Sequence, residues 1–158
     1  MGKERFLKEA LLKIENNFDY IIFDCPPTLG ILTINALVAA KEVVIPAELD
    51  LYSMQGIGDM LKTVERVKEL FNPYLVITWI LPCKVNPRRT LSQKLLEKYE
   101  ELFPGKLLRT FVRIDVSLME TVGFRKSIYD YKPVSHGAED YNSFTVELLE
   151  KNQCLVKN

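Results

Sequence analysis

The chain lacks the features of a secreted or membrane-spanning protein. Its three cysteines, Cys25, Cys83 and Cys154, have no paired spacing, which argues against a disulfide framework or a zinc knuckle. No apolar run approaches the ~20 residues that span a bilayer, and the first residues are charged rather than an apolar signal core. These absences predict reduced thiols and a soluble, cytoplasmic protein.

An excess of charge of one sign is also missing. Lys plus Arg number 21 and Asp plus Glu number 21, so net charge gives no sign of a polyanionic partner. The single histidine, His136, is predicted to be a turn or capping residue, because no second histidine exists to pair with it. With 158 residues, 47% hydrophobic and 27% charged, the composition is typical of one globular domain over residues 1–158.

Apolar periodicity predicts helices and strands in alternation. Helices are expected at residues 3–16, 29–40, 50–71 and 88–103, with shorter ones at 116–121 and 137–149. Short apolar runs predict strands at residues 20–23, 43–45, 75–81 and 107–112. Strands separated by helices of this length indicate an α/β fold with a doubly wound parallel sheet.

The apolar run at residues 20–23 ends at a carboxylate, Asp24, which Pro26, Pro27 and Gly30 follow. Ligands of open α/β sheets bind beyond the carboxyl ends of the strands, where an Asp can organise magnesium beside phosphates. The prolines stiffen the turn and Gly30 allows a close approach of the backbone. Spacing alone leaves a structural alternative open, in which Asp24 forms a turn or caps a helix.

Residues 24–37 read Asp-Cys-Pro-Pro-Thr-Leu-Gly-Ile-Leu-Thr-Ile-Asn-Ala-Leu. This segment resembles the D-x-P-P-x-x-G-x-L-T-x-N-A-L signature of the ParA/Soj-type partition ATPases, a MinD-like family with a deviant Walker A motif. Residues 42–46, 52–56, 86–90, 114–131 and 137–141 resemble later segments of that family in the same order. Gln55 and Arg125 depart from the pattern, since the family usually has an acidic residue and a glycine there.

The resemblance implies ATP and magnesium as cofactors and a sheet of the P-loop NTPase type. Asp24 would organise the magnesium, and no catalytic residue is assigned. Pro26, Pro27 and Gly30 would lie in the switch that responds to the nucleotide. The loops at residues 82–85 and 112–115, which include Pro82 and Val112, would flank the adenine.

The phosphate-binding loop of that family is missing from the sequence. The family begins with a strand and a K-G-G-x-x-K-[ST] loop, whereas no G-x-x-x-x-G-K-[ST] motif occurs here. The chain therefore resembles a C-terminal portion without the N-terminal P-loop strand, and we expect it not to hydrolyse ATP alone. A truncated gene, a split protein with a separate P-loop-bearing chain, and a domain with a new role all remain open.

Basic residues concentrate between positions 84 and 113, where eight cations face three glutamates. The cations are Lys84, Arg88, Arg89, Lys94, Lys98, Lys106, Arg109 and Arg113. By the resemblance, this part of the fold binds non-specific DNA, for which scattered phosphate contacts suffice. Arg88, Arg89 and Arg109 are the main candidates, and the alternative is a solvated helix surface.

The resemblance leads to the hypothesis of a ParA/Soj-like protein of chromosome or plasmid segregation. Its family partners would be non-specific DNA, a ParB-like protein that triggers hydrolysis, and a second ParA-like chain. The alternative is a non-enzymatic interaction module, or a truncated remnant, that binds a full-length ParA-like partner. No membrane partner is expected, because residues 147–158 are too short and weakly amphipathic.

Overall fold

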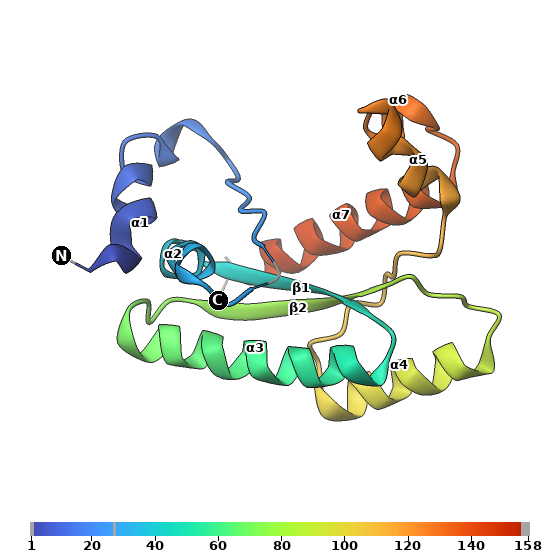
Figure 1. The fold of residues 1–158 in the computed structure, drawn as a ribbon, viewed down its shortest axis with the longest axis horizontal. Helices are drawn as coiled ribbons and strands as arrows, with labels where there is room; N and C mark the ends of the chain where they lie inside the picture. The colour runs from blue at the N-terminus through green and yellow to red at the C-terminus, as the bar shows by residue number, and fades with distance from the viewer. Residues whose placement is uncertain (1, 27, 156–158) are drawn as a thin grey trace. The chain divides into compact units, whose positions relative to one another are not determined.

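A computed structural model describes residues 2–26 and 28–155 (Figure 1). The chain divides into two compact units, each described by itself. Unit 1 comprises Met1–Val44 and Gln55–Thr78, and unit 2 comprises Ile45–Met54 and Trp79–Asn158. A single domain over residues 1–158 stays a prediction.

Unit 1 begins with short helical segments that pack on a longer helix. These are η1 (Lys3–Arg5), α1 (Phe6–Leu11), η2 (Glu15–Asn17) and α2 (Ile31–Ala39). α2 contacts both η1 and α1. The buried apolar residues of this unit are Ala36, Leu37, Val38, Val43, Ile57, Val64, Val67 and Leu75.

The sheet pairs β1 (Glu42–Glu48) with β2 (Val76–Cys83), and α3 (Leu51–Leu70) connects them. A strand–helix–strand connection of this length makes the two strands parallel, as the sequence predicts. α3 begins after Asp50, whose Oδ1 accepts a hydrogen bond from the Ser53 backbone N–H at 2.8 Å. This contact caps the helix. The α/β class with a parallel sheet is confirmed.

Unit 2 contains α4 (Thr90–Leu102), α5 (Val116–Phe124), α6 (Ile128–Tyr131) and α7 (His136–Leu155). Tyr99 of α4 is fully buried, and its hydroxyl donates to the backbone oxygen of Glu48 at 2.8 Å. The buried apolar residues here are Ala47, Ile80, Leu81, Val85, Tyr99, Phe103, Leu108, Val112, Ile128 and Ala138.

The strand predicted at residues 20–23 is absent, and this prediction is wrong. Residues 20–26 have no regular secondary structure, and Tyr20 and Ile22 are 62% and 89% exposed. Four consecutive apolar or aromatic residues signal burial, but a strand also needs a neighbour to accept and donate its backbone hydrogen bonds. No described segment provides that neighbour.

Two further strand predictions need correction. Residues 107–112 form no continuous strand, although isolated parallel bridges join Ile80 to Leu107 and Val85 to Arg113. Pro46 does not end the second strand, because β1 continues to Glu48. A proline is tolerated in a strand whose N–H side meets no partner.

Candidate functional site

Asp24 lies exposed between the irregular residues 20–23 and the turn that leads to α2. Pro26 is exposed beside it, whereas Pro27 lies outside the described residues. Partial burial, together with the negative charge of Asp24, raises the pKa of the neighbouring Cys25 thiol. Cys25 is therefore a protonated thiol at neutral pH, so it offers no thiolate nucleophile beside the carboxylate.

Gly30 is the N-cap residue of α2, with φ −90° and ψ −176°. This extended conformation suits any residue, and a Cβ built on Gly30 would come no closer than 4.0 Å to Thr28 Oγ1. The described fold therefore does not itself require glycine here. The cap has no side-chain hydrogen bond, so the first N–H groups of α2 lie at an open helix N-terminus, a place suited to anions.

Thr33 and Asn35, from the same signature, are buried and hold unit 1 together. Thr33 Oγ1 donates to the Thr28 backbone oxygen at 2.6 Å, which fixes the turn before α2. Asn35 Nδ2 donates to the Lys3 backbone oxygen at 2.8 Å, and its Oδ1 accepts from the Leu7 N–H at 3.2 Å. These two residues thus have structural roles that the sequence prediction did not assign.

The described residues contain no group of three or more His, Cys, Asp or Glu side chains that could hold a metal ion. Magnesium is commonly bound through one or two carboxylates, with water and substrate phosphates as the other ligands. Asp24 fits the role of such a single carboxylate. It does not form a magnesium site by itself, so the fit depends on phosphates held by another group.

Pro82 and Val112 lie together in unit 2, although Pro82 belongs to β2 rather than to a loop, and their expected place beside the adenine stays a prediction. The Val112 N–H donates to the Pro82 backbone oxygen at 2.8 Å, and the Val85 N–H donates to the Val112 oxygen at 3.0 Å. Between them, Lys84 has a positive φ of 54° and pairs with Glu48, which raises the pKa of the Lys84 ammonium. The loop after β2 is thereby fixed against the segment at residues 106–114.

Asp115 connects the second predicted loop to two helices. Its Oδ1 accepts from the Ser117 N–H at 2.8 Å at the start of α5, and its Oδ2 accepts from the Gly137 N–H at 2.7 Å at the start of α7. Burial opposes ionisation, but these two backbone donors outweigh it and hold the pKa of Asp115 below its usual value.

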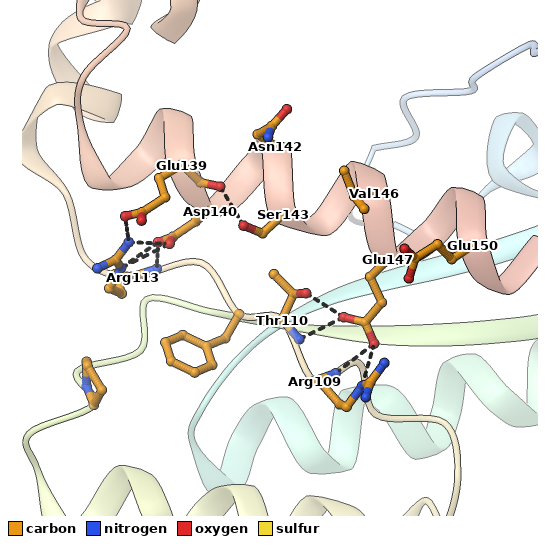
Figure 2. Close-up of a pocket in the computed structure, with 12 residues that line it drawn as sticks. Arg109, Thr110, Arg113, Glu139, Asp140, Asn142, Ser143, Val146, Glu147 and Glu150 are labelled. Atoms are coloured by element: carbon orange, nitrogen blue, oxygen red, sulfur yellow. Dashed lines mark hydrogen bonds and ion pairs between the residues drawn. The ribbon is translucent and has the colours of Figure 1, made fainter.

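An open groove lies between α7 and residues 109–113 (Figure 2). Glu147 reaches across it from α7, and its side chain is only 7% exposed. Its carboxylate accepts from the backbone N–H groups of Arg109 at 3.1 Å and Thr110 at 2.8 Å, and from the Thr110 hydroxyl. Burial opposes ionisation of Glu147, but the hydrogen bonds from Thr110 and Arg109 lower its pKa overall.

Asp140 makes the same kind of contact two helical turns earlier on α7. Its carboxylate accepts from the Arg113 N–H at 2.8 Å and from the Arg113 guanidinium at 2.6 to 3.0 Å. Glu139 also pairs with Arg113, and the hydrogen bonds to both carboxylates raise the pKa of that guanidinium. Arg113 is therefore engaged within the fold rather than presented to a ligand.

The three arginines proposed for DNA contact are all exposed. Arg88 and Arg89 precede α4, and neither side chain has an ion pair among the residues that the structure describes. The Arg109 side chain is 86% exposed, with its Nε 3.7 Å from Glu147 Oε1. Arg88 and Arg89 are thus the less compensated cations.

Asp140 and Glu147 line the groove beside α7 and were not singled out from the sequence, whereas Asp115 belongs to the predicted loop at residues 112–115. The only local signal is the seven-residue spacing of Asp140 and Glu147 on one predicted helix, which places both on the same face. Their backbone partners come from residues 109–113, and no local pattern in the sequence predicts that pairing.

No helix in the described part of the chain is both long and apolar enough to cross a bilayer. Trp79 is part of β2, and the Lys151 ammonium lies 3.9 Å from the centroid of its ring. His136 begins α7 and lies 3.7 Å from Glu139 Oε2. His136 is thus the first residue of the last helix rather than a turn or capping residue before it, and Ser135 Oγ instead accepts from the Ala138 N–H.

The fold is α/β with a parallel sheet, and it is consistent with a partial fold of the P-loop NTPase type. A solved cobyrinic acid a,c-diamide synthase from Mycobacterium smegmatis, with bound ADP and magnesium, matches with a TM-score of 0.78 and 30% identity. The match covers 96% of this chain and 55% of that one. McdA from Cyanthece shares the fold, with a TM-score of 0.74 at 18% identity over 89% of this chain and 58% of that one.

Sequence comparison specifies the family. A family model described as AAA_31, an AAA domain, matches residues 1–77. The sporulation initiation inhibitor protein Soj of Bacillus subtilis is 38% identical over 94% of this chain and 58% of its own length. The chromosome partitioning protein ParA of Myxococcus xanthus is 34% identical over 96% of this chain and 53% of its own.

The chain is similar to the ParA/Soj-type partition ATPases over nearly its whole length, which confirms the resemblance that its sequence signature predicts. It spans little more than half the length of the curated relatives it matches.

Proposed function

We propose that this chain supplies the magnesium-organising carboxylate and the DNA-facing surface of a ParA/Soj-type ATPase of DNA segregation. One observation carries the proposal. Within the family signature, Thr33 and Asn35 are buried and hydrogen-bonded, whereas the exposed Asp24 side chain has no hydrogen bond or ion pair among the described residues and the fold does not require a glycine at position 30. A motif that served folding alone would require Thr33 and Asn35, but not Asp24 or Gly30.

Asp24 would act as one magnesium ligand, or orient a water that is one, while nucleotide phosphates and water complete the coordination. Pro26, Pro27 and Gly30 would carry the response to the terminal phosphate, and the loops with Pro82 and Val112 would contact the adenine. Phosphate loop amides and their lysine supply most of the electrostatic stabilisation in phosphoryl transfer. The 158 residues alone would therefore not hydrolyse ATP, and a loop-bearing polypeptide would complete the site.

DNA would be held through phosphate contacts by Arg88, Arg89 and Arg109. The side chains of Arg88 and Arg89, which are exposed and have no ion pair among the described residues, support this, and the chromosome partitioning protein ParA of M. xanthus supports a role in segregation. Cytoplasmic DNA and a ParB-like activator would be the partners. A role as a non-enzymatic module that binds a full-length ParA-like chain is the second candidate, which the exposed apolar residues 20–22 favour.

ATP hydrolysis by reconstituted protein tests the proposal. The purified chain would be mixed with, or fused behind, the part of B. subtilis Soj that it does not match. We expect no hydrolysis by the chain alone, magnesium-dependent hydrolysis by the fusion, and loss of that activity in Asp24→Ala. Asp19→Ala is the matched control, because Asp19 is another exposed carboxylate on the same irregular stretch.

Hydrolysis by the chain alone would contradict the assignment of the phosphate site to another polypeptide. Hydrolysis by the fusion that survives Asp24→Ala would contradict the role of Asp24. If the fusion folds well but binds no ATP, and the chain binds full-length Soj, the role as a non-enzymatic module is favoured.

A further inference from the structure

Helix α5 of unit 2 exposes four apolar side chains, called here the α5 face: Val116, Met119, Val122 and Phe124. They are 59%, 67%, 79% and 61% exposed. The first three recur every third residue and so form one ridge along the helix. Phe124 ends the helix and stacks on Tyr131 of α6, and this helix pair leads into α7 (Figure 1). Neighbouring exposed apolar residues of this kind mark a surface on which another molecule docks.

Arg125 follows α5 in a backbone conformation that favours glycine. It is the C-cap residue, with φ 51° and ψ 40°, and its N–H donates to the Thr121 and Val122 oxygens. A side chain in this left-handed region lowers stability, because its Cβ crowds the backbone. Lys84, the other non-glycine residue with positive φ in the described chain, pairs with Glu48. No ion pair in the described fold offsets the cost at Arg125.

The charges that lack partners beside the α5 face are positive. Arg125 and Lys126 are both exposed, and neither has an ion pair among the residues that the structure describes. The three carboxylates between residues 114 and 134 already accept hydrogen bonds within unit 2. Their donors are the Ser117 and Gly137 N–H groups for Asp115, the Tyr131 hydroxyl for Glu120, and the Ser127 hydroxyl for Asp130. A ligand with carboxylates therefore complements the end of the α5 face.

A lipid surface and a second copy of the chain fit this surface less well. Glu120 is exposed and lies four residues from both Val116 and Phe124, so a bilayer that buried those side chains would also receive this carboxylate. In a two-fold contact between copies, Arg125 and Lys126 of both chains would gather around one axis, which like-charge repulsion opposes. A helix of another protein can instead set its own acidic residues against these cations.

We propose that the α5 face docks an amphipathic helix of a partner protein, whose carboxylates pair with Arg125 and Lys126. The apolar ridge of that helix would lie against Val116, Met119 and Val122, since ridges on two helices pack into each other's grooves. The thioether of Met119 adapts its shape to such a contact. Arg125 then serves binding rather than stability. The inference does not depend on ATP or DNA.

Fluorescence anisotropy with a designed peptide tests the inference on the full chain. The probe is a labelled amphipathic helix of about five turns, with leucines along one face and glutamates on the other. The control peptide carries lysines in place of the glutamates. The acidic peptide should bind saturably, and the basic one at least about tenfold more weakly. Equal affinities, or no binding of the acidic peptide, would overturn the proposal.

Met119→Asp tests the apolar ridge. Met119 is 67% exposed, so the variant should fold as the parent does, and its affinity for the acidic peptide should fall by about tenfold or more. Leu91→Asp is the matched control, because Leu91 is 64% exposed on α4 of the same unit, and its affinity should not change. The same loss of affinity in both variants would contradict a specific face.

Arg125→Gly separates binding from folding. Glycine suits a φ of 51° better than arginine does, so the midpoint of thermal unfolding should stay or rise, while the affinity for the acidic peptide falls by about fivefold or more. Lys84→Gly changes a residue of similar conformation, and should leave the affinity as it is. A lower midpoint with unchanged affinity in Arg125→Gly would assign Arg125 to the fold and overturn its role in binding.

The other occupants give distinct results, each of which would overturn a partner helix. Vesicles of phosphatidylcholine and phosphatidylserine that displace the peptide would identify a lipid surface. Self-association in sedimentation that Met119→Asp abolishes would identify a second copy. Peptide binding by the chain that is lost in the fusion with the unmatched part of B. subtilis Soj would show that this part covers the face. We expect the fusion to bind the peptide as the chain does, whether or not it hydrolyses ATP.

Discussion

At the scale of single residues, the buried carboxylates of unit 2 mainly accept hydrogen bonds from backbone N–H groups. Asp115 accepts from the first N–H groups of two helices, and Glu147 accepts from consecutive N–H groups of an irregular segment. Removing such a carboxylate lowers the free energy of unfolding strongly, because a buried N–H donor is left without an acceptor. Their loss should therefore appear in stability before it appears in binding.

Glu147→Ala should lower the free energy of unfolding by about 1–3 kcal/mol, because the Thr110 and Arg109 N–H groups lose a buried acceptor. Urea denaturation measures this. The folded pKa of Glu147 is lowered, so its stabilisation is present above the unfolded value, about 4.3, and is lost as pH falls through the folded pKa. The gap between wild type and variant should thus close in acid. Glu150→Ala, an exposed neighbour on α7, should change stability little at any pH.

Gly137→Ala should destabilise the protein by about 1–3 kcal/mol through overpacking. A Cβ at Gly137 would lie 2.6 Å from Leu118 Cγ, where α7 begins against α5. Gly58→Ala is the contrasting variant, because nothing lies within 4 Å of its Cβ position in α3. That change should stabilise by about 0.5–1 kcal/mol. Thermal unfolding of both variants shows the opposite signs, and equal signs would contradict the close contact.

At the scale of elements, helices were predictable and strands only in part. Periodicity located α2, α3, α4 and the start of α7 closely, because a helix makes its backbone hydrogen bonds within itself. However, α7 continues beyond its expected end at residue 149, and the helix expected at residues 3–16 is divided into η1, α1 and η2. Residues 20–23 and 107–112 carry equally clear apolar runs, but a strand depends on a neighbour that its own sequence does not specify. The same reason hid the pairing of α7 carboxylates with residues 109–113.

Less of the candidate site follows from the sequence. Asp24 and Gly30 of the signature lie on an exposed stretch, but the roles expected for them, and for Pro82 and Val112, stay predictions. The roles of Thr33 and Asn35 depended on contacts with Thr28, Lys3 and Leu7, two of which are far away in sequence. Spacing alone carries no information about such contacts.

The cap of α3 can be tested as an element. Asp50→Ala removes the acceptor of the Ser53 N–H and should cost about 0.5–2 kcal/mol. Chemical denaturation followed by circular dichroism measures the change. Asp59→Ala, which removes an exposed pair with Lys62 on the same helix, should cost no more than about 0.5 kcal/mol. Equal effects would contradict the capping role.

At the scale of the whole molecule, zero net charge conceals an uneven distribution. The exposed Arg88 and Arg89 precede α4, whereas Arg109 and Arg113 face the carboxylates of α7. Any polyanion would therefore meet effective positive charge at residues 88–89 more than in the α7 groove, where Glu139, Glu147 and Glu150 oppose it. For the binding of a polyanion, the distance of each basic residue from acidic side chains thus matters more than the number of basic residues.

Replacing Arg88 and Arg89 together with Gln should weaken DNA binding by the reconstituted protein and reduce its salt dependence. Each lost phosphate contact lowers the slope of log K against log salt by about 0.9, so the double variant should lose about two. Arg66→Gln, an exposed arginine of α3, is the control with no expected change. Fluorescence anisotropy at several salt concentrations measures the slope for each variant. An unchanged slope in the double variant would favour the alternative, in which these arginines lie on a solvated surface and do not contact DNA.

Asp140 and Glu147 also limit how α7 can change during evolution. Their carboxylates meet Arg113 and Arg109 only because seven residues return a helix to nearly the same face. One inserted or deleted residue between them would turn one carboxylate by about 100° away from its amide. We therefore expect substitutions to accumulate freely at exposed positions outside the groove, such as Thr145, while length changes between positions 140 and 147 are eliminated.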